Sequence, residues 1–234
     1  MTAAYPVRVS FTNHVTAADW QALQQAGQPV QLGRKHGLFL QDEQSRDVFV
    51  LLHGAVKVYR TEANGSETML TVRSTGDLLG DIAALDGTPR SASVSVLRPV
   101  TARKLTTEQF LKLVDDRDLH PALRRYTNAR LRESDEQRVE IASLPVPQRL
   151  ARALLRLAKA TPDGPNQASL DLGLSQDGLA QLIGASRNAV VTAITRFRDD
   201  RLIATAPRRF VLLDLSRLAR IGYSGPRSGS HSST

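Results

Sequence analysis

The sequence predicts an α+β fold in which a β-roll comes first, a long helix follows and a winged helix-turn-helix comes last. Three observations support this order. Residues 30–105 contain short apolar and alternating segments punctuated by glycine, which is typical of antiparallel strands in a compact roll or barrel. A helical pattern then runs over 121–144. Two short helical patterns separated by a single glycine turn lie within 175–203.

Composition restricts the possible partners. The 234 residues carry a formal net charge of +8, and residues 145–234 hold 13 Lys and Arg against 6 Asp and Glu. A basic C-terminal part favours a polyanion such as nucleic acid, although a general solubility effect would give the same bias. The chain contains no cysteine, which excludes disulfides and thiolate metal sites and fits a reducing cytoplasm. No apolar run approaches the roughly 18 residues of a membrane span, so we expect no membrane partner.

Local signals define the elements of the first half. Residues 17–26 predict a short helix, and 93–105 alternate with the period of a half-buried strand. Asn64-Gly65 lies between two apolar runs and predicts a hairpin with a two-residue turn. Thr106 precedes Gln109 by three residues, which predicts a capping box at the start of the next helix.

The segment 121–144 carries one face with the spacing of a coiled-coil seam. Its members are Leu123, Thr127, Arg130, Ser134, Gln137, Ile141 and Leu144. The centre of this seam is polar, which leaves two interpretations open. The helix either lies partly exposed on its own domain, or it pairs with a second copy while its centre contacts another group. Pro145 and Pro147 follow, and two prolines this close predict a hinge.

The last part carries the pattern of a helix-turn-helix. Ser175 is a plausible N-cap of a first helix, Gly184 ends that helix, and Ser186 caps a second one. The second helix has a polar side made of Ser186, Arg187, Asn188, Thr192 and Arg196. An arginine at a helix start can bind guanine with two hydrogen bonds, and a capped helix start can hold a phosphate. A plain helical hairpin is the alternative. Residues 203–215 predict a β-hairpin wing with Arg208 and Arg209 at its tip.

The stretch "GDIAALDGTPRSA", residues 80–92, places an acid after a glycine and an Arg-Ser pair at the other end. This pattern suits a cradle for an anion that also carries hydroxyl groups. A surface loop with an ordinary solvated ion pair is the alternative.

With both motifs in this order, the chain resembles the cyclic-AMP receptor protein (CRP/FNR) family of bacterial transcription regulators, from about residue 20 to residue 215. The resemblance implies a homodimer that binds double-stranded DNA, cyclic AMP (cAMP) as effector, RNA polymerase as a further partner, and no enzymatic activity. It divides the chain into a cyclic-nucleotide-binding β-roll at 1–120, a dimerisation helix at 121–144, a winged helix-turn-helix at 145–220 and a disordered tail at 221–234.

The resemblance also implies an effector site, carried over residue by residue. Arg90 would neutralise the cyclic phosphate, Ser91 would donate a hydroxyl hydrogen bond to it, and Asp81 would accept from the ribose 2′-hydroxyl. The family's cAMP binders commonly have Glu at this position, and Asp is one methylene shorter. The complete implied site is Leu79, Gly80, Asp81, Ile82, Ala83, Arg90, Ser91, Arg130, Ser134 and Asp135. Ser134 would meet the adenine amino group, and Asp135 would reach in from the other subunit.

The implied DNA-contacting residues are Ser175, Gln176, Ser186, Arg187, Asn188, Thr192 and Arg208. Asn188 stands where the family commonly has Glu and should prefer adenine N6 and N7. Thr192 stands where the cAMP member has a second base-reading Arg. We therefore predict a half-site related to the usual TGTGA but different from it. A ligand-independent regulator, or one with a different small effector, stays open. A haem sensor would depend on His53, the one histidine well placed in the roll.

Overall fold

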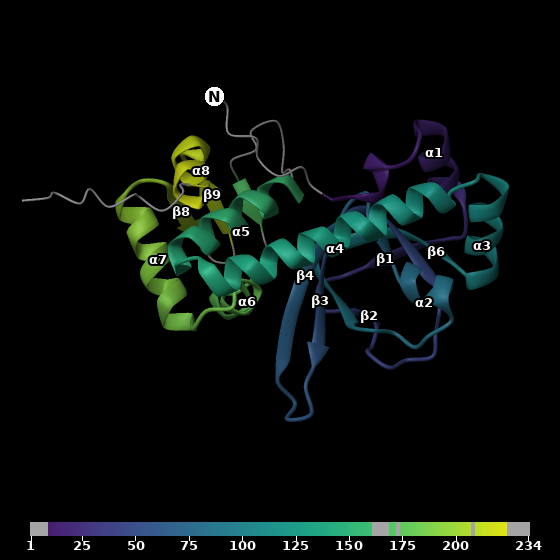
Figure 1. Ribbon diagram of the computed structural model, residues 1–234, viewed down its shortest axis with the longest axis horizontal. Helices are drawn as coiled ribbons and strands as arrows, with labels where there is room; N and C mark the ends of the chain where they lie inside the picture. The colour runs from purple at the N-terminus through teal and green to yellow at the C-terminus, as the bar shows by residue number, and fades with distance from the viewer. Residues whose placement is uncertain (1–8, 161–168, 172–173, 207–208, 224–234) are drawn as a thin grey trace, which may run out of the picture.

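The computed structural model describes residues 9–160, 169–171, 174–206 and 209–223, which form two parts joined by one long helix (Figure 1). The first part holds the strands β1 to β6 and the helices α1 to α3. The second part holds α5 to α8 and the strands β7 to β9. Within the described ranges, every helix is too short or too polar to cross a membrane.

The first part is built on an antiparallel sheet. Its order is β1-β6-β3-β4, with β2 also paired to β6 and β5 to β3. The strands are β1 (Gln28–Leu32), β2 (Gly37–Phe39), β3 (Val48–Thr61), β4 (Glu67–Ser74), β5 (Leu78–Leu79) and β6 (Ser93–Leu105). The pairing of β3 with β6 shifts register between Leu51 and Val56. Such irregularities bend a strand pair, which lets the sheet fold over into the predicted roll.

The hairpin predicted at Asn64-Gly65 is confirmed, but its turn is longer than expected. β3 ends at Thr61 and β4 begins at Glu67. The Gly65 amide donates to the Glu62 carbonyl at 2.8 Å. Gly65 has a φ of +80° whereas Asn64 keeps a negative φ. The prediction of a two-residue turn is therefore wrong, because a turn followed by a left-handed glycine makes the connection.

Two helices close one end of the roll. They are α1 (Ala17–Gln25) and α3 (Thr107–Asp116). The predicted capping box is confirmed, since Thr106 Oγ1 accepts from the Gln109 amide at 3.2 Å and Gln109 Oε1 accepts from the Thr106 amide at 3.1 Å. Leu23 and Phe110 of these helices lie in one buried cluster with Tyr126 of the long helix.

The long helix is α4 (His120–Ser143), close to the predicted range. Leu123 of α4 is only 4% exposed and packs into the roll, and Arg130 forms an ion pair with the roll. Leu123 therefore lies against the helix's own domain, and Arg130 in the polar centre contacts another group. Pairing of this helix with a second copy stays a prediction. Leu131 and Val139 are 58% and 62% exposed and mark a different, outward face.

The second part contains the predicted helix pair and wing. Its elements are α5 (Val146–Ala160), β7 (Ser169–Asp171), α6 (Gln176–Leu182), α7 (Arg187–Asp199), β8 (Ile203–Ala206), β9 (Arg209–Leu212) and α8 (Leu215–Tyr223). Pro145 separates α4 from α5, but Pro147 lies in the first turn of α5, where its missing N–H is tolerated. The strand β7 and the helix α8 were not predicted from the sequence. Residues 221–223 belong to α8 rather than to the predicted tail, and the rest of that tail, from 224, lies outside the described residues.

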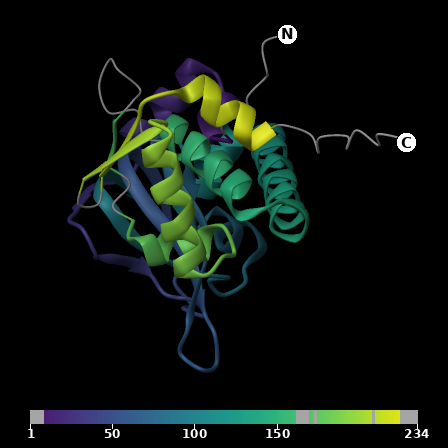
Figure 2. The same cartoon turned by 90° about the vertical axis from the view of Figure 1, so that its left-hand side faces the viewer.

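The two parts share a hydrophobic contact. Ala55, Met69 and Leu97 of the roll belong to the same buried cluster as Leu179 of α6 and Leu154 of α5. Figure 2 shows α7 on the outer side of the second part, facing away from the roll. The roll therefore supports α6, while α7 stays accessible.

Candidate functional site

Gly80 shapes the turn at the start of the 80–92 stretch. It follows β5 and caps α2 (Asp81–Asp86) with a left-handed φ of +80°. A Cβ at this position would lie 2.7 Å from the Asp47 carbonyl oxygen and would collide with the Arg90 guanidinium. The turn requires glycine because both the backbone angle and the close approach exclude a side chain.

Arg90 is buried at the other end of the stretch and is only 2% exposed. It donates to the Gly80 carbonyl at 3.2 Å and to the Asp47 carbonyl at 2.7 Å, and its guanidinium carbon lies 4.1 Å from the centre of the Phe39 ring. Its Nε is buried without a hydrogen-bond partner among the described residues. Burial lowers the pKa of Arg90 despite the opposing effect of nearby carboxylates. The site therefore holds a desolvated cation whose Nε–H has no acceptor among the described residues.

Asp81 begins α2 and is 1% exposed. Both of its carboxylate oxygens accept from Arg130 Nη1 of α4, at 3.0 and 3.1 Å. Burial acts to lower the pKa of Arg130, but Asp81 and Tyr126 outweigh it, so the net shift is upward. The structure thus joins the roll to α4 through two predicted site residues, and the Asp81 carboxylate is occupied by Arg130.

These groups line a cavity of about 70 Å³. Of the predicted effector residues, it contains Leu79, Gly80, Asp81, Ile82, Ala83, Arg90, Ser91 and Arg130. Ser134 and Asp135 of α4 do not line it, and the exposed Asp135 contacts Arg138 at 3.3 Å. Ligand pockets typically measure about 300–1,000 Å³, so this cavity must widen to admit a nucleotide.

Arg73 also lines this cavity, although it was not among the site residues predicted from the sequence. It lies on β4, is 6% exposed, and its Nη2 is 2.8 Å from Glu133 Oε2 of α4. The sequence does contain an indication of a functional role for Arg73, since this arginine interrupts the alternating apolar pattern of the strand "MLTVRS". The cavity wall thus holds three arginines, of which Arg73 is neutralised by Glu133 and Arg130 by Asp81. Among the described residues, no carboxylate forms an ion pair with Arg90, so its charge is the least directly compensated of the three.

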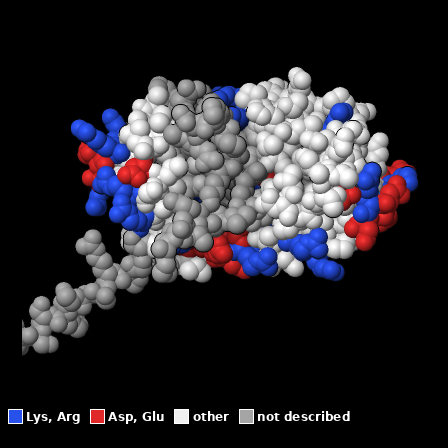
Figure 3. Space-filling view, turned by 90° about the horizontal axis from the view of Figure 1, so that it is seen from above, with Lys and Arg blue, Asp and Glu red and all other residues white. Residues whose placement is uncertain are grey.

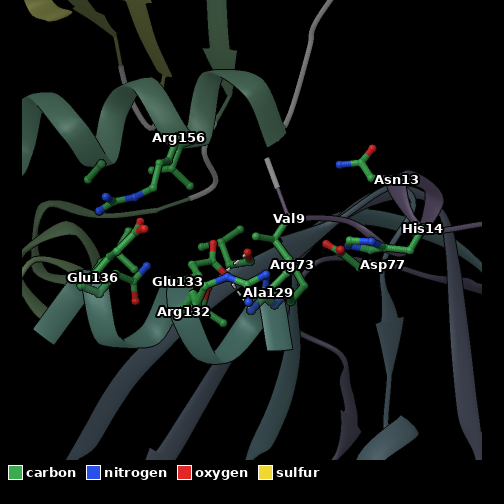
Figure 4. A pocket seen from close by; sticks show the side chains of 16 residues that line it. Val9, Asn13, His14, Arg73, Asp77, Ala129, Arg132, Glu133, Glu136 and Arg156 are labelled. Carbon is green, nitrogen blue, oxygen red and sulfur yellow. Dashed lines mark hydrogen bonds and ion pairs between the residues drawn. The ribbon is translucent and has the colours of Figure 1, made fainter. Parts of the chain in front are cut away.

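A larger cavity of about 520 Å³ lies beside it, between β4, α4 and α5 (Figure 4). Its wall mixes both signs of charge, with Arg73, Arg132, Arg156, Asp77, Glu133 and Glu136. Arg73 and Thr71 line both cavities. The strand β4 therefore lies between the smaller cavity, which holds the predicted effector residues, and the larger cavity at the junction of the two parts.

The helix pair α6 and α7 has the predicted caps. Ser175 Oγ accepts from the Gly178 amide at 3.1 Å, and Ser186 Oγ accepts from the Ala189 amide at 3.2 Å. Gly184 has a φ of +59° in the turn between the helices. Arg149 of α5 donates to the Ile183 and Gly184 carbonyls at 2.7 and 2.8 Å. This arginine, which the sequence analysis did not select, ties the turn to α5.

The predicted DNA-contacting residues of these helices lie on an exposed surface. Ser175, Gln176, Ser186, Arg187, Asn188 and Thr192 are all exposed, while Arg208 lies outside the described residues. Arg187 Nε is 3.5 Å from Asp177 Oδ1, a loose contact between two exposed side chains. Each capping serine accepts with its oxygen and keeps its hydroxyl proton for another acceptor. In Figure 3, Lys and Arg side chains gather with some carboxylates at the end of the molecule where α7 and α8 lie.

Comparisons with known proteins match both parts of the chain. The description "Cyclic nucleotide-binding domain" matches residues 29–117, and "Crp-like helix-turn-helix domain" matches residues 148–221. A "CRP-like cAMP-activated global transcriptional regulator" from Mycobacterium tuberculosis (strain CDC 1551 / Oshkosh) is 30% identical over 202 residues, which cover 85% of this chain and 90% of that protein. The "cAMP-activated global transcriptional regulator CRP" of Pasteurella multocida is 26% identical over 73% of this chain and 82% of its own length.

Solved structures show the same architecture. A CRP-family transcriptional regulator from Thermus thermophilus has a TM-score of 0.71 and 25% identity, with 84% of this chain and 97% of that chain covered. FixK2 from Bradyrhizobium japonicum has a TM-score of 0.74 at 16% identity, with 86% and 99% covered. A domain of the cyclic-nucleotide-binding type joined to a helix-turn-helix defines a DNA-binding transcription regulator, a class of protein that is not an enzyme. The chain belongs to the CRP/FNR family.

Proposed function

We propose that this regulator responds to cAMP and binds a pseudo-palindromic operator as a homodimer. The observation that carries the effector assignment is the buried Arg90, which forms no ion pair among the described residues, while Arg73 and Arg130 in the same cavity wall each pair with a carboxylate. A cyclic nucleotide brings one negative charge, which can pair with Arg90. The names of the relatives from M. tuberculosis and P. multocida, both called cAMP-activated, support the same effector.

The proposed binding mode follows from the residues of the cavity. Arg90 donates its free Nε and its guanidinium N–H groups to the cyclic phosphate, and Ser91 adds a hydroxyl bond. Asp81 accepts from the ribose 2′-hydroxyl once Arg130 releases it. Charge-assisted hydrogen bonds of this kind contribute about 1.5–3 kcal/mol each. Leu79, Ile82 and Ala83 supply apolar and backbone contact. The ligand therefore competes with the Asp81–Arg130 ion pair. Its binding would free Arg130 of α4 from Asp81 and so change the contact between α4 and the roll.

The outward face of α4 supports the proposed homodimer. Leu131 and Val139 are 58% and 62% exposed on this helix. A second α4 would remove this apolar surface from water. Ser134 and Asp135 lie outside the chain's own cavity, and we propose that they complete the effector site in the dimer, with Asp135 reaching the partner's site. Twofold symmetry would place two α7 helices in successive major grooves, about one helical turn apart, as known for this type of protein.

The DNA-binding proposal assigns Arg187 to guanine and Asn188 to adenine. Ser175, Gln176, Ser186 and Arg208 would position the helix pair through phosphate contacts, and Thr192 would face the groove. RNA polymerase is the further partner implied by the family. cAMP would act by binding more tightly to the arrangement in which both α7 helices can bind DNA, with a typical coupling of about 1–3 kcal/mol.

Calorimetric titration of cAMP tests the effector assignment, with cyclic GMP as the reference nucleotide. We expect micromolar binding with about one site per subunit and a preference for the adenine nucleotide. Arg90→Ala should weaken binding about 10- to 150-fold, whereas Arg60→Ala, an exposed arginine of β3, should not. Arg90→Lys, which keeps the charge, serves as a second variant if the alanine protein fails to fold.

A ligand-independent regulator is the second candidate. The small volume of the cavity and the Asp81–Arg130 pair that fills it favour this alternative. Absence of heat and of thermal stabilisation with cAMP, together with operator binding by the free protein, would establish it.

A further inference from the structure

The exposed face of α7 contains one aliphatic side chain among polar ones. Val191 is 37% exposed. The opposite face of the helix is buried and consists of Val190, Ala193, Ile194 and Phe197. Val191 belongs to none of the hydrophobic clusters formed by the described residues. Packing against the described residues therefore does not explain an apolar side chain at this position.

Helix geometry places Val191 between the two proposed base-contacting residues. Successive residues of an α-helix are rotated by about 100°. Val191 is therefore turned by about 40° from Arg187 and by about 60° from Asn188, and it lies one turn further along the helix. Thr195, another turn on, continues the same exposed stripe. Any surface that receives Arg187 and Asn188 must also face Val191.

The chemistry of the major groove decides what Val191 can contact there. Base edges in the groove present hydrogen-bond donors and acceptors, which a valine side chain cannot satisfy. The exception is the C5-methyl group of thymine, which is apolar. We propose that Val191 is a specificity-determining residue that contacts a thymine methyl group in each half-site. This inference rests on the proposed reading of DNA by Arg187 and Asn188.

The size of the effect follows from the area involved. Removing one methyl-sized group from water contributes about 0.8 kcal/mol, which corresponds to about a fourfold change in affinity. This value is smaller than that of a two-hydrogen-bond contact from arginine to guanine. Val191 would therefore refine the half-site that Arg187 and Asn188 define.

The test replaces thymine by deoxyuridine, which removes the methyl group and leaves the pairing edge unchanged. An operator is first selected from random duplexes with the full-length protein and cAMP. Each thymine of that operator is then replaced in turn. We expect the wild-type protein to lose about fourfold in affinity at one thymine per half-site. Val191→Ala should bind the thymine and uracil operators equally, with about the affinity of the wild type for uracil.

Two controls separate this contact from a general loss of binding. Leu213→Ala truncates another exposed aliphatic residue, 55% exposed and outside α7, and should keep the discrimination between thymine and uracil. Thermal unfolding should show that Val191→Ala is folded. The inference is wrong if the wild type tolerates every deoxyuridine, or if Val191→Ala still discriminates. Failure to select any operator would instead overturn the proposed sequence-specific reading, and the role of Val191 with it.

Discussion

Glu140 binds Arg156 through both carboxylate oxygens, at 2.8 and 2.9 Å. Arg152 donates to the same carboxylate at 3.2 Å and also to the Gly222 carbonyl at 2.6 Å. Glu140 is 6% exposed and lies in the last turn of α4, while both arginines belong to α5. The network therefore joins the long helix to the second part of the molecule across the break at Pro145.

Glu140→Gln should destabilise the protein because it leaves two largely buried arginines without a counter-charge. Breaking a buried pair of this kind costs about 3–5 kcal/mol, and we expect urea unfolding to show a loss of about 3 kcal/mol. Glu136→Gln, one turn earlier and exposed, is the matched control and should change stability by less than about 0.5 kcal/mol. Equal effects of the two substitutions would show that the junction does not depend on this carboxylate.

The Asp81–Arg130 pair allows a second comparison between a buried and an exposed ion pair. The Asp81 side chain is 2% exposed, and that of Arg130 is 24% exposed. Asp81→Asn should lower the free energy of unfolding of the ligand-free protein by about 3 kcal/mol. Asp135→Asn breaks the exposed contact with Arg138 and should cost less than about 1 kcal/mol. Thermal and urea unfolding without nucleotide measure both, and a neutral Asp81→Asn would contradict the prediction.

Gly80 and Gly37 differ in what an added methyl group would meet. At Gly37 nothing lies within 4 Å of the place that a Cβ would take, and its φ is not positive, whereas Gly80 combines a φ of +80° with close contacts to Asp47 and Arg90. Gly80→Ala should therefore reduce stability by more than about 1 kcal/mol and disturb Arg90, while Gly37→Ala should be nearly neutral. Unfolding curves and cAMP titration of both variants check this contrast.

His14 should make the stability of the protein depend on pH. Burial, followed by the positive charges of Arg125 and Arg132, lowers the pKa of His14 from 6.5. The unfolded chain then binds a proton at His14 more readily than the folded chain, so this residue reduces stability as pH falls below about 6.5. Above that pH it has no such effect. Urea midpoints at pH 7.5 and 5.5 should fall less in His14→Gln than in the wild type, and identical falls would exclude His14 as a cause.

Arg187→Ala should weaken binding to the selected operator by about 1–3 kcal/mol and relax the choice at one base pair. The reason is that a guanine contact contributes to one sequence and not to others. Competition assays with single-base operator variants measure both effects. A uniform loss on all sequences, with a reduced salt dependence, would mean that Arg187 contacts phosphate instead.

Local sequence patterns were sufficient to predict most of the helices, caps and turns. The capping box at Thr106, the caps at Ser175 and Ser186 and the turn at Gly184 each depend on residues within a few positions of one another, so the sequence predicted them correctly. The turn at Asn64-Gly65 was misjudged because the pairing of β3 with β4, and not the dipeptide, set the loop length. The helix α8 was not predicted because its apolar residues are buried by packing against α5, a contact between distant parts of the sequence.

The sequence by itself determined the order of the elements, the helix caps and the residue types that a phosphate and a base edge require. Only the tertiary structure decided how those residues are paired. Asp81 meets Arg130 across 49 positions, and Arg73 meets Glu133 from a different element, so no local pattern could reveal either contact. Which groups Leu123 and Arg130 of the α4 seam contact was likewise decided by the packing of the roll. A helical face has no fixed partner until the roll folds against it, because burial is a property of the packed chain and not of the helix.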